Sequence, residues 1–383
     1  MASSIGWLDH DREDADRARR LISLFSRAEA RDELGLGTIR DAFSDLLFPG
    51  TSTIQTRLRY FILIPRIMGE ISPRLPKAPD REAALRRREA DLIDQLGEAR
   101  DKRGLIGADA GKDLKRMPSA VYWHGLGRWG IRLAPNDGVA LTLDKMAAGT
   151  DCWSPVPDDG ALDGFVMTPA ERDFVIEQLE GLKVAGTAPA ISWLFSNAHR
   201  FIKALGGRGA LLNAGLEEAL SAMQGSGAPA TLVEDVRCAA LLAQVMHGAA
   251  LLYNEMLAGH FDDGEKAREY SAWLDSWRRE LPRQPLDPGV LLAPVRRTLE
   301  GRPLNPHTLA FVEGWFALAW KAPRGAEAKA LVKAREQATK PARARLSKPA
   351  GKGEWSGASG ASRLDFRWAT TRQYLLDLTG PAR

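Results

Sequence analysis

Hydroxyl, amide and guanidinium side chains follow one another closely between Pro49-Gly50 and Tyr60. Hydroxyl and amide groups bond to phosphate oxygens or base edges, and arginine adds the positive charge that attracts a polyphosphate. The segment therefore predicts a nucleic-acid contact made by Thr51, Ser52, Thr53, Gln55, Thr56, Arg57 and Arg59. The alternative is a buried helical hairpin, in which Ser and Thr only cap a helix and Arg57 pairs with Asp41 or Asp45.

A second candidate is the basic segment Lys321–Lys352, which has ten Lys or Arg residues against Glu327 and Glu336. Its local charge of +8 is twice the net charge of +4 of the whole chain. Because neutralised phosphates release counterions, such a segment attracts nucleic acid in a salt-dependent way. The contacts expected in it are Lys329, Lys333, Arg335, Lys340, Arg343 and Arg345. The alternative is a solvated face or a disordered linker.

Aromatic residues could act as stacking platforms for bases, since the chain has eleven Trp residues. Tyr122, Trp123 and Trp129 lie close together, with Arg128 beside them. The helical spacing of Tyr122, Leu126 and Trp129 instead favours packing in a core. The same interpretation is given to Trp273, Trp277, Trp315 and Trp320.

The chain has no familiar catalytic or metal-binding motif. Its two cysteines, Cys152 and Cys238, form no CxxC pair, its six histidines are scattered, and neither GxxxxGK[ST] nor GxSxG occurs. His260-Phe261-Asp262-Asp263 most simply caps the following helix, and Glu327-x-Lys329 lacks the strand and upstream Asp of a nuclease motif. No catalytic residue, metal ligand or cofactor is therefore predicted, and enzymatic activity is left open, with a non-enzyme preferred.

The elements that would position these residues are mostly helices. A helix at Thr38–Leu47, the turn Phe48-Pro49-Gly50 and a second helix from Thr51 or Ser52 to Pro65 predict a helix-turn-helix-like unit. Thr168 and Thr231 open capping boxes, and the second of these begins a long, buried helix that ends near Ala258. Other segments are predicted as follows: helices after Asp9 (with Ala18, Leu21, Ile22 and Phe25 on one side) and at 81–103, 189–205, 264–280, 288–299 and 306–320; a linker at 72–80; a strand-like fragment at 139–143.

The fold class predicted is mainly α, a multi-helical chain with a helix-turn-helix-like N-terminal unit and a buried long central helix in its C-terminal half. Four regions are expected: 1–110, with the helix-turn-helix-like unit at 37–65; 111–165, an aromatic helix with a Gly/Pro-rich loop; 166–320, a C-terminal helical domain; 321–383, a basic flexible segment and a docked C-terminal helix. The start of the chain has no signal-peptide pattern, and the apolar run 238–253 is too short to span a bilayer. A cytoplasmic protein with no membrane contact is expected.

Three segments together resemble a known family: Ser4–Asp9, Arg31–Phe61, and Tyr122-Trp123 with Gly125-Leu126 and Trp129–Ile131. Leu364–Trp368 is similar to the closing motif of the same family. It is a bacterial family of unknown function, numbered six-three-six-one among such domains. The resemblance is most specific across residues 31–61 and implies a genomic setting in phage-defence regions, near genes for helicases and phospholipase-D-like nucleases. The family has no established catalytic residues to carry over.

These observations favour a non-catalytic adaptor or nucleic-acid-binding subunit of a phage-defence assembly, whose helicase or nuclease partners supply the chemistry. Nucleic acid is the expected partner, bound without sequence preference. One alternative is a metal-dependent nuclease whose carboxylates converge only in the fold, with Asp41, Asp45, Asp262 and Asp263 as first suspects. The other is a protein-interaction or sensor subunit that does not contact nucleic acid.

Overall fold

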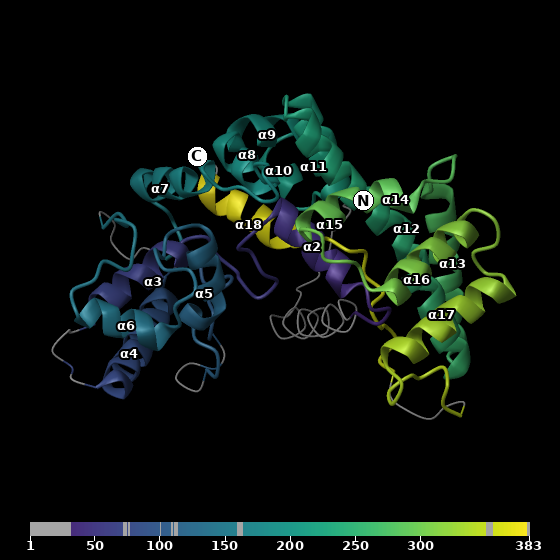
Figure 1. Cartoon of the computed structure of the whole chain (residues 1–383), viewed down its shortest axis with the longest axis horizontal. Helices are drawn as coiled ribbons and strands as arrows, with labels where there is room; N and C mark the ends of the chain where they lie inside the picture. Colours follow the sequence, from purple (N-terminus) through teal and green to yellow (C-terminus); the bar gives the residue numbers. More distant parts are fainter. Residues whose placement is uncertain are drawn as a thin grey trace, which may run out of the picture. The chain divides into compact units, whose positions relative to one another are not determined.

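The structure, a computed structural model, is helical almost throughout (Figure 1). It describes residues 32–71, 75, 77–99, 101–108, 110, 114–158, 164–349 and 355–380. Within these ranges no strand is formed, and pairing is limited to isolated bridges such as Arg132 with Trp153. The prediction of a mainly α chain is confirmed. The helix expected after Asp9 and the Ser4–Asp9 motif lie outside the described residues.

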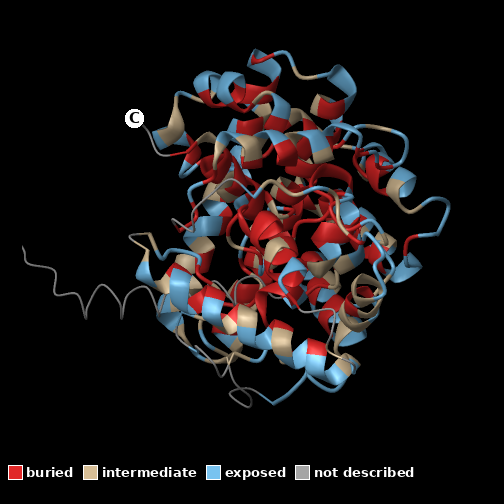
Figure 2. Ribbon diagram, turned by 90° about the vertical axis from the view of Figure 1, so that its left-hand side faces the viewer, coloured by how far each residue is buried: buried red, intermediate tan, exposed pale blue. Residues whose placement is uncertain are grey.

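The chain divides into two units, each assembled from stretches that are far apart in the sequence. Unit 1 comprises residues 1–40, 241–293 and 302–364. Unit 2 comprises residues 41–240, 294–301 and 365–383. Figure 2 shows buried residues on the inward sides of the helices and exposed residues on their outer sides.

In unit 2 the N-terminal helices form one packed group. Helix α3 (Tyr60–Gly69) is buried on nearly every side, and it packs against α4 (Ala78–Glu98) and α5 (Pro118–Arg128). Helix α6 (Val139–Ala147) covers α4, and α2 (Gly37–Leu47) precedes the group in the chain. At the end of α5, Trp129 stacks on Phe61 of α3, with ring centroids 3.9 Å apart. Burial of these rings stabilises the contact between α3 and α5.

The remaining helices of unit 2 surround the C-terminal helix α18 (Trp368–Thr379). Their bounds are α7 Pro169–Glu180, α8 Ala190–Ser196, α9 Ala198–Ala204, α10 Arg208–Leu211, α11 Leu216–Gly225 and α15 Ala293–Thr298. Helix α18 contacts α8, α9 and α10, and the Trp368 indole N–H donates to the Ala214 carbonyl at 2.8 Å. The capping box predicted at Thr168 is present at the start of α7.

Unit 1 is built on the second part of α12 (Ala230–His260). Helices α13 (Gly264–Glu280), α14 (Pro288–Leu291), α16 (Pro306–Ala319) and α17 (Ala326–Thr339) complete it. The indole N–H groups of Trp277 and Trp315 donate to the carbonyls of Gln244 and Val245 on α12, at 2.7 and 2.8 Å. Among the described helices α12 is long and apolar enough to cross a membrane, but 72% of its most apolar stretch is buried. Helix α12 is therefore a buried core helix, as the sequence predicts.

Three local predictions are wrong. Residues 139–143 form the start of α6 and not a strand, because apolar residues at 139, 141 and 143 also fit one short amphipathic helix. Helix α12 begins at Ala230, so Thr231 lies inside it. The Gly/Ser-rich residues 355–362 belong to the segment 321–383, where flexibility was expected before the C-terminal helix, but they are packed: Asn254 on α12 exchanges two hydrogen bonds with Ser359, at 2.7 and 2.8 Å.

His247 on α12 gives unit 1 a specific acid sensitivity. Burial lowers the pKa of its imidazole to about 4, and nearby Arg363 acts in the same direction. The unfolded chain therefore takes up this proton near pH 6.5, whereas the folded chain resists it until about pH 4. Stability from this group is complete above pH 6.5 and is lost as the pH falls. Between these two pH values the free energy of unfolding falls by up to about 1.4 kcal/mol for each pH unit.

We expect thermal denaturation between pH 7 and pH 4.5 to show this loss in the native chain. His247→Gln keeps a side-chain N–H for the Ala361 carbonyl, which His247 Nε2 contacts at 3.0 Å, but cannot titrate. The difference in stability between the two proteins should shrink or reverse as the pH falls. Parallel pH profiles for the two proteins would contradict the assignment.

Candidate nucleic-acid interface

The segment expected to open a recognition helix at Thr51 is a loop. Residues 48–59 connect α2 to α3, and helix begins again only at Tyr60. Polar side chains of the loop bond to the loop itself: Thr51 Oγ1 donates to the Phe48 carbonyl at 2.6 Å, and Gln55 Oε1 accepts from the Ser52 N–H at 2.9 Å. Thr51 and Gln55 are buried. Two short helices, α2 and α3, are therefore present, but the prediction of a recognition helix that begins at Thr51 is wrong.

Arg57, a predicted contact, is held inside unit 2. Its Nε donates to Asp377 on α18 at 3.0 Å, and its Nη1 reaches Asp101 at 3.2 Å. The guanidinium carbon also lies 4.5 Å from the centroid of the Phe165 ring. Burial raises the pKa of Asp377, while Arg57 and the Leu58 N–H act against that rise. The sequence correctly suggested an acid partner as the alternative, but the partners are Asp377 and Asp101, not Asp41 or Asp45.

Arg59 is buried more deeply still, with 1% of its side chain exposed. It donates through Nε and Nη2 to Glu171 at 3.0 and 3.1 Å and through Nη1 to the Gly164 carbonyl. Arg66 on α3 pairs with the same carboxylate at 3.1 Å. Only Ser52 and Thr56, both half-buried, and Thr53, exposed, remain near the surface among the contacts predicted in this loop. The physical reason is that two acids from distant parts of the chain attract these arginines into the core.

The basic segment is partly neutralised in the same way. Arg335 is buried and donates to the carbonyls of Leu34 and Gly35 at 2.7 and 2.9 Å. Lys340 and Arg345 both pair with Glu33, whose side chain is 3% exposed. Glu33, an acid outside the segment, therefore holds Lys340 and Arg345 in ion pairs. Arg335 donates hydrogen bonds to backbone carbonyls. The prediction that these three residues contact nucleic acid at the surface is wrong.

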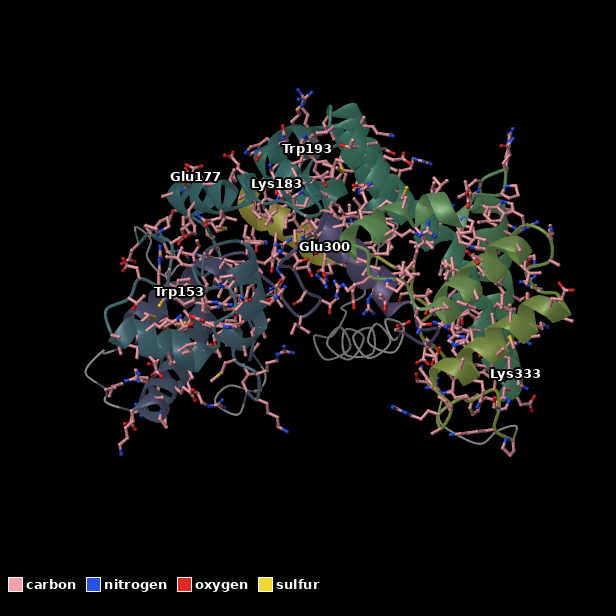
Figure 3. All side chains as sticks on the ribbon, in the orientation of Figure 1. Trp153, Glu177, Lys183, Trp193, Glu300 and Lys333 are labelled. Carbon is pink, nitrogen blue, oxygen red and sulfur yellow. The ribbon has the colours of Figure 1, made fainter. Side chains whose placement is uncertain are left out.

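Among the described residues of the basic segment, a smaller set of cations remains at the surface of unit 1. It consists of Lys321, Lys329, Lys333, Arg343 and Lys348, all exposed and without an ion pair to another described residue. Lys329 and Lys333 are one turn apart on α17, so they share a face of that helix. Lys333 is labelled in Figure 3. Three of the predicted contacts, Lys329, Lys333 and Arg343, therefore stand where a polyanion can reach them.

The aromatic cluster around Tyr122 and Trp129 packs in the core, as predicted. The same prediction fails for one tryptophan elsewhere in the chain. Tyr122 and Trp129 are buried, and the Tyr122 hydroxyl accepts the N–H groups of Thr56 and Arg57, both at 2.9 Å. These bonds fix the loop before α3. Trp273 differs, because 43% of it is exposed, so its interpretation as a core residue is wrong.

Two of the four acids suspected of nuclease chemistry have other roles. Asp45 pairs with Arg367 at 2.7 Å, and Asp263 caps α13 by accepting the Lys266 N–H at 3.0 Å. In the part of the chain that the structure describes, no group of three or more His, Cys, Asp or Glu residues is placed to hold a metal ion. The described residues therefore offer no constellation on which the nuclease alternative can be built.

A pocket of about 570 Å³ lies beside α3 in unit 2. Leu63, Ile67 and Leu92 give it an apolar floor, and Trp153 and Arg66 stand at its edge. Arg66 is already committed to Glu171 and to the Pro157 carbonyl, its Nε donating to the latter at 2.7 Å. Two acids also line the pocket: Glu70 pairs with Arg88, and Asp158 lies 3.6 Å from Arg66. Each charged lining residue is thus already in an ion pair.

A family model described as "Family of unknown function (DUF6361)" matches residues 2–149 and 230–381. No curated protein and no solved structure matches the chain. The matched ranges include the loop 48–59, α5, α17 and α18, and they agree with the resemblance seen in Arg31–Phe61, Tyr122–Ile131 and Leu364–Trp368. Because the model matches well over half of the residues, this chain belongs to the family of unknown function DUF6361.

Proposed function

We propose that this chain is a non-catalytic adaptor that contacts nucleic acid through unit 1, without preference for base sequence. We further propose that it works in the cytoplasm within a bacterial antiphage assembly, in which partner proteins supply helicase or nuclease activity. The nucleic-acid part rests on the exposed cations of α17 and of the segment that follows it. The antiphage part rests on the genomic setting that the family resemblance implies.

The observation that carries the proposal is the outer face of α17. Lys329 and Lys333 project from it, and Gln337 continues the stripe one turn later. The neighbouring exposed positions are Ala330, Ala334 and Ala338. Because alanine side chains are short, they do not hold a phosphate backbone away from the lysines. Lysine binds phosphate as a point charge and reads no base pattern, so contact of this kind is non-specific.

The first test is a salt titration with duplex DNA. Lys329→Gln/Lys333→Gln removes two phosphate contacts, so the slope of log affinity against log salt should fall by about two. Affinity at low salt should fall equally for unrelated DNA sequences. Fluorescence anisotropy of a labelled 20-base-pair duplex measures both quantities.

The matched control is Lys183→Gln/Lys203→Gln, which removes two exposed lysines from unit 2. It causes the same loss of net charge at other positions, and Figure 3 labels Lys183. The control should leave the salt slope almost unchanged. If both double variants bind alike, or the native chain does not bind, α17 is not a nucleic-acid interface. An acidic protein partner then becomes the better occupant of this face.

A second test predicts tighter binding. Glu33→Gln removes the carboxylate shared by Lys340 and Arg345, so both cations become available to phosphate. The salt slope should therefore steepen, by up to about two for two new contacts. Glu177→Gln, an exposed acid on α7, is the control for a general change in charge. Unchanged or weaker binding by Glu33→Gln, in a chain that still folds by circular dichroism, would contradict a phosphate-binding role for this part of unit 1.

A further inference from the structure

A second hollow, in unit 1, has a different chemical character from the lysine face of α17. It has a volume of about 350 Å³ and lies between α12, α13 and the segment around Ala361. The lining residues that the argument uses are His247 and Leu251 of α12, and Trp273, Ser276, Trp277 and Glu280 of α13. One wall is thus formed by two indoles, and one carboxylate stands among the lining groups.

The two indoles are held in different ways. Trp277 is buried, with 2% of its surface exposed, because its N–H donates to Gln244 and its ring fills the space beside Gly248. It supports the inner side of the pocket and has no free ring face. Trp273 is supported from one side by an edge-to-face contact with Tyr270, with centroids 5.0 Å apart. An indole with 43% of its surface exposed at the border of a pocket retains a face for a ligand.

The charges at the pocket are few. Glu280 is the one carboxylate among the lining residues, and its Oε1 accepts a hydrogen bond from Ser276 at 3.3 Å. His247 is neutral there, since burial lowers its pKa, and its Nε2–H donates to the Ala361 carbonyl. Arg363 also acts on His247 but is not among the lining residues. The lining therefore presents electron-rich rings and one negative charge.

The pocket is separate from the α17 lysines. Trp273, Ser276, Trp277 and Glu280 lie on one side of α13 by helical spacing. The opposite side bears Ser271, Asp275 and Arg278, which bond to Arg324 and to the carbonyls at the end of α16. The pocket side of α13 is thus not the side that contacts Arg324 and α16, and no residue of α17 lines the pocket.

We infer that this pocket binds an alkylated ammonium group, with Trp273 contacting the cation through its ring face and Glu280 as counter-charge. Electron-rich indole faces attract organic cations, and the attraction is strongest for cations that lose little hydration on entering an apolar site. Alkylated ammonium groups meet this condition better than a primary amine does. A small quaternary amine and the methylated lysine of a protein partner share this chemistry.

The test uses the full chain and choline chloride, with sodium chloride keeping the ionic strength constant. Choline should bind saturably, as followed by calorimetry and by quenching of tryptophan fluorescence. Its neutral isostere, 3,3-dimethyl-1-butanol, should bind at least about tenfold more weakly, because it has the same shape and no charge. A peptide with trimethyllysine and the same peptide with lysine form the second arm. Binding of choline indicates a small-molecule source, and binding of the trimethyllysine peptide alone indicates a protein source.

Variants separate the pocket from a general effect on the fold. Trp273→Ala and Glu280→Gln should each weaken binding about tenfold, Trp273→Phe should weaken it less, and Glu265→Gln, an exposed acid elsewhere on α13, should not. Trp273 is exposed, so its loss leaves the helix content by circular dichroism unchanged. The inference is overturned if neither choline nor the trimethyllysine peptide binds, if the neutral alcohol binds as well as choline, or if Trp273→Ala binds like the native chain. Each of these results leaves the salt dependence assigned to α17 untouched.

Discussion

Replacing Glu171 by Gln is expected to destabilise the chain by about 3–5 kcal/mol, among the largest single effects in the molecule. The Glu171 side chain is fully buried and pairs with two guanidinium groups, Arg59 with 1% exposure and Arg66 with 11%. Glutamine keeps the shape but removes the only buried carboxylate that these arginines share among the described residues. Arg59 then remains inside unit 2 without this buried counter-charge, whereas Arg66 still has the exposed Asp158 at 3.6 Å. The desolvation cost of the buried guanidinium groups is the source of the loss.

Urea denaturation followed by circular dichroism measures this effect. The control is Glu177→Gln on the same helix α7, where the side chain is exposed and a change within about 0.5 kcal/mol is expected. A midpoint for Glu171→Gln equal to that of Glu177→Gln would show that Glu171 is not the counter-charge of the two arginines.

Trp129→Ala should cost a similar amount, about 3–5 kcal/mol, for a different reason. The indole is 1% exposed, stacks on Phe61, and donates its N–H to the Pro49 carbonyl at 2.8 Å. Alanine leaves a cavity in the α3–α5 contact and removes the hydrogen bond that holds the start of the loop 48–59. The loss combines apolar burial with an unpaired carbonyl.

Two variants define the cause. Trp129→Phe should recover part of the stability, because the stacked ring remains while the bond to Pro49 is lost. Trp273→Ala, the exposed tryptophan of unit 1, should cost much less. Equal losses for Trp129→Ala and Trp273→Ala in denaturant would mean that burial does not decide the effect.

Much of the helical fold could be predicted from local patterns. The helix expected at 264–280 has those same bounds in α13, and the capping box at Thr168 opens α7. In both cases a cap, a charged first turn and an apolar stripe agree within a few residues of one another. Residues 139–143 failed because a segment this short fits a strand and a helix equally well.

The candidate interface was harder to predict, because the decisive contacts come from distant residues. Arg57 meets Asp377, 320 positions later, and Lys340 meets Glu33, 307 positions earlier. A count of charge along the sequence cannot see such partners, so it overestimated the accessible charge of the basic segment. Asp377, an acid within the apolar segment Tyr374–Leu378, is a local signal for an ion pair that the sequence analysis did not use.

The position of α18 has a consequence for how the protein is made. A ribosome releases residues 41–240 long before it synthesises Trp368–Thr379. Until then Arg57 lacks the buried carboxylate of Asp377, and the apolar sides of α8 and α9 lack one of the helices that cover them. The nascent unit 2 must therefore wait, with this surface open to chaperones or to aggregation, for a late segment of the chain to close it.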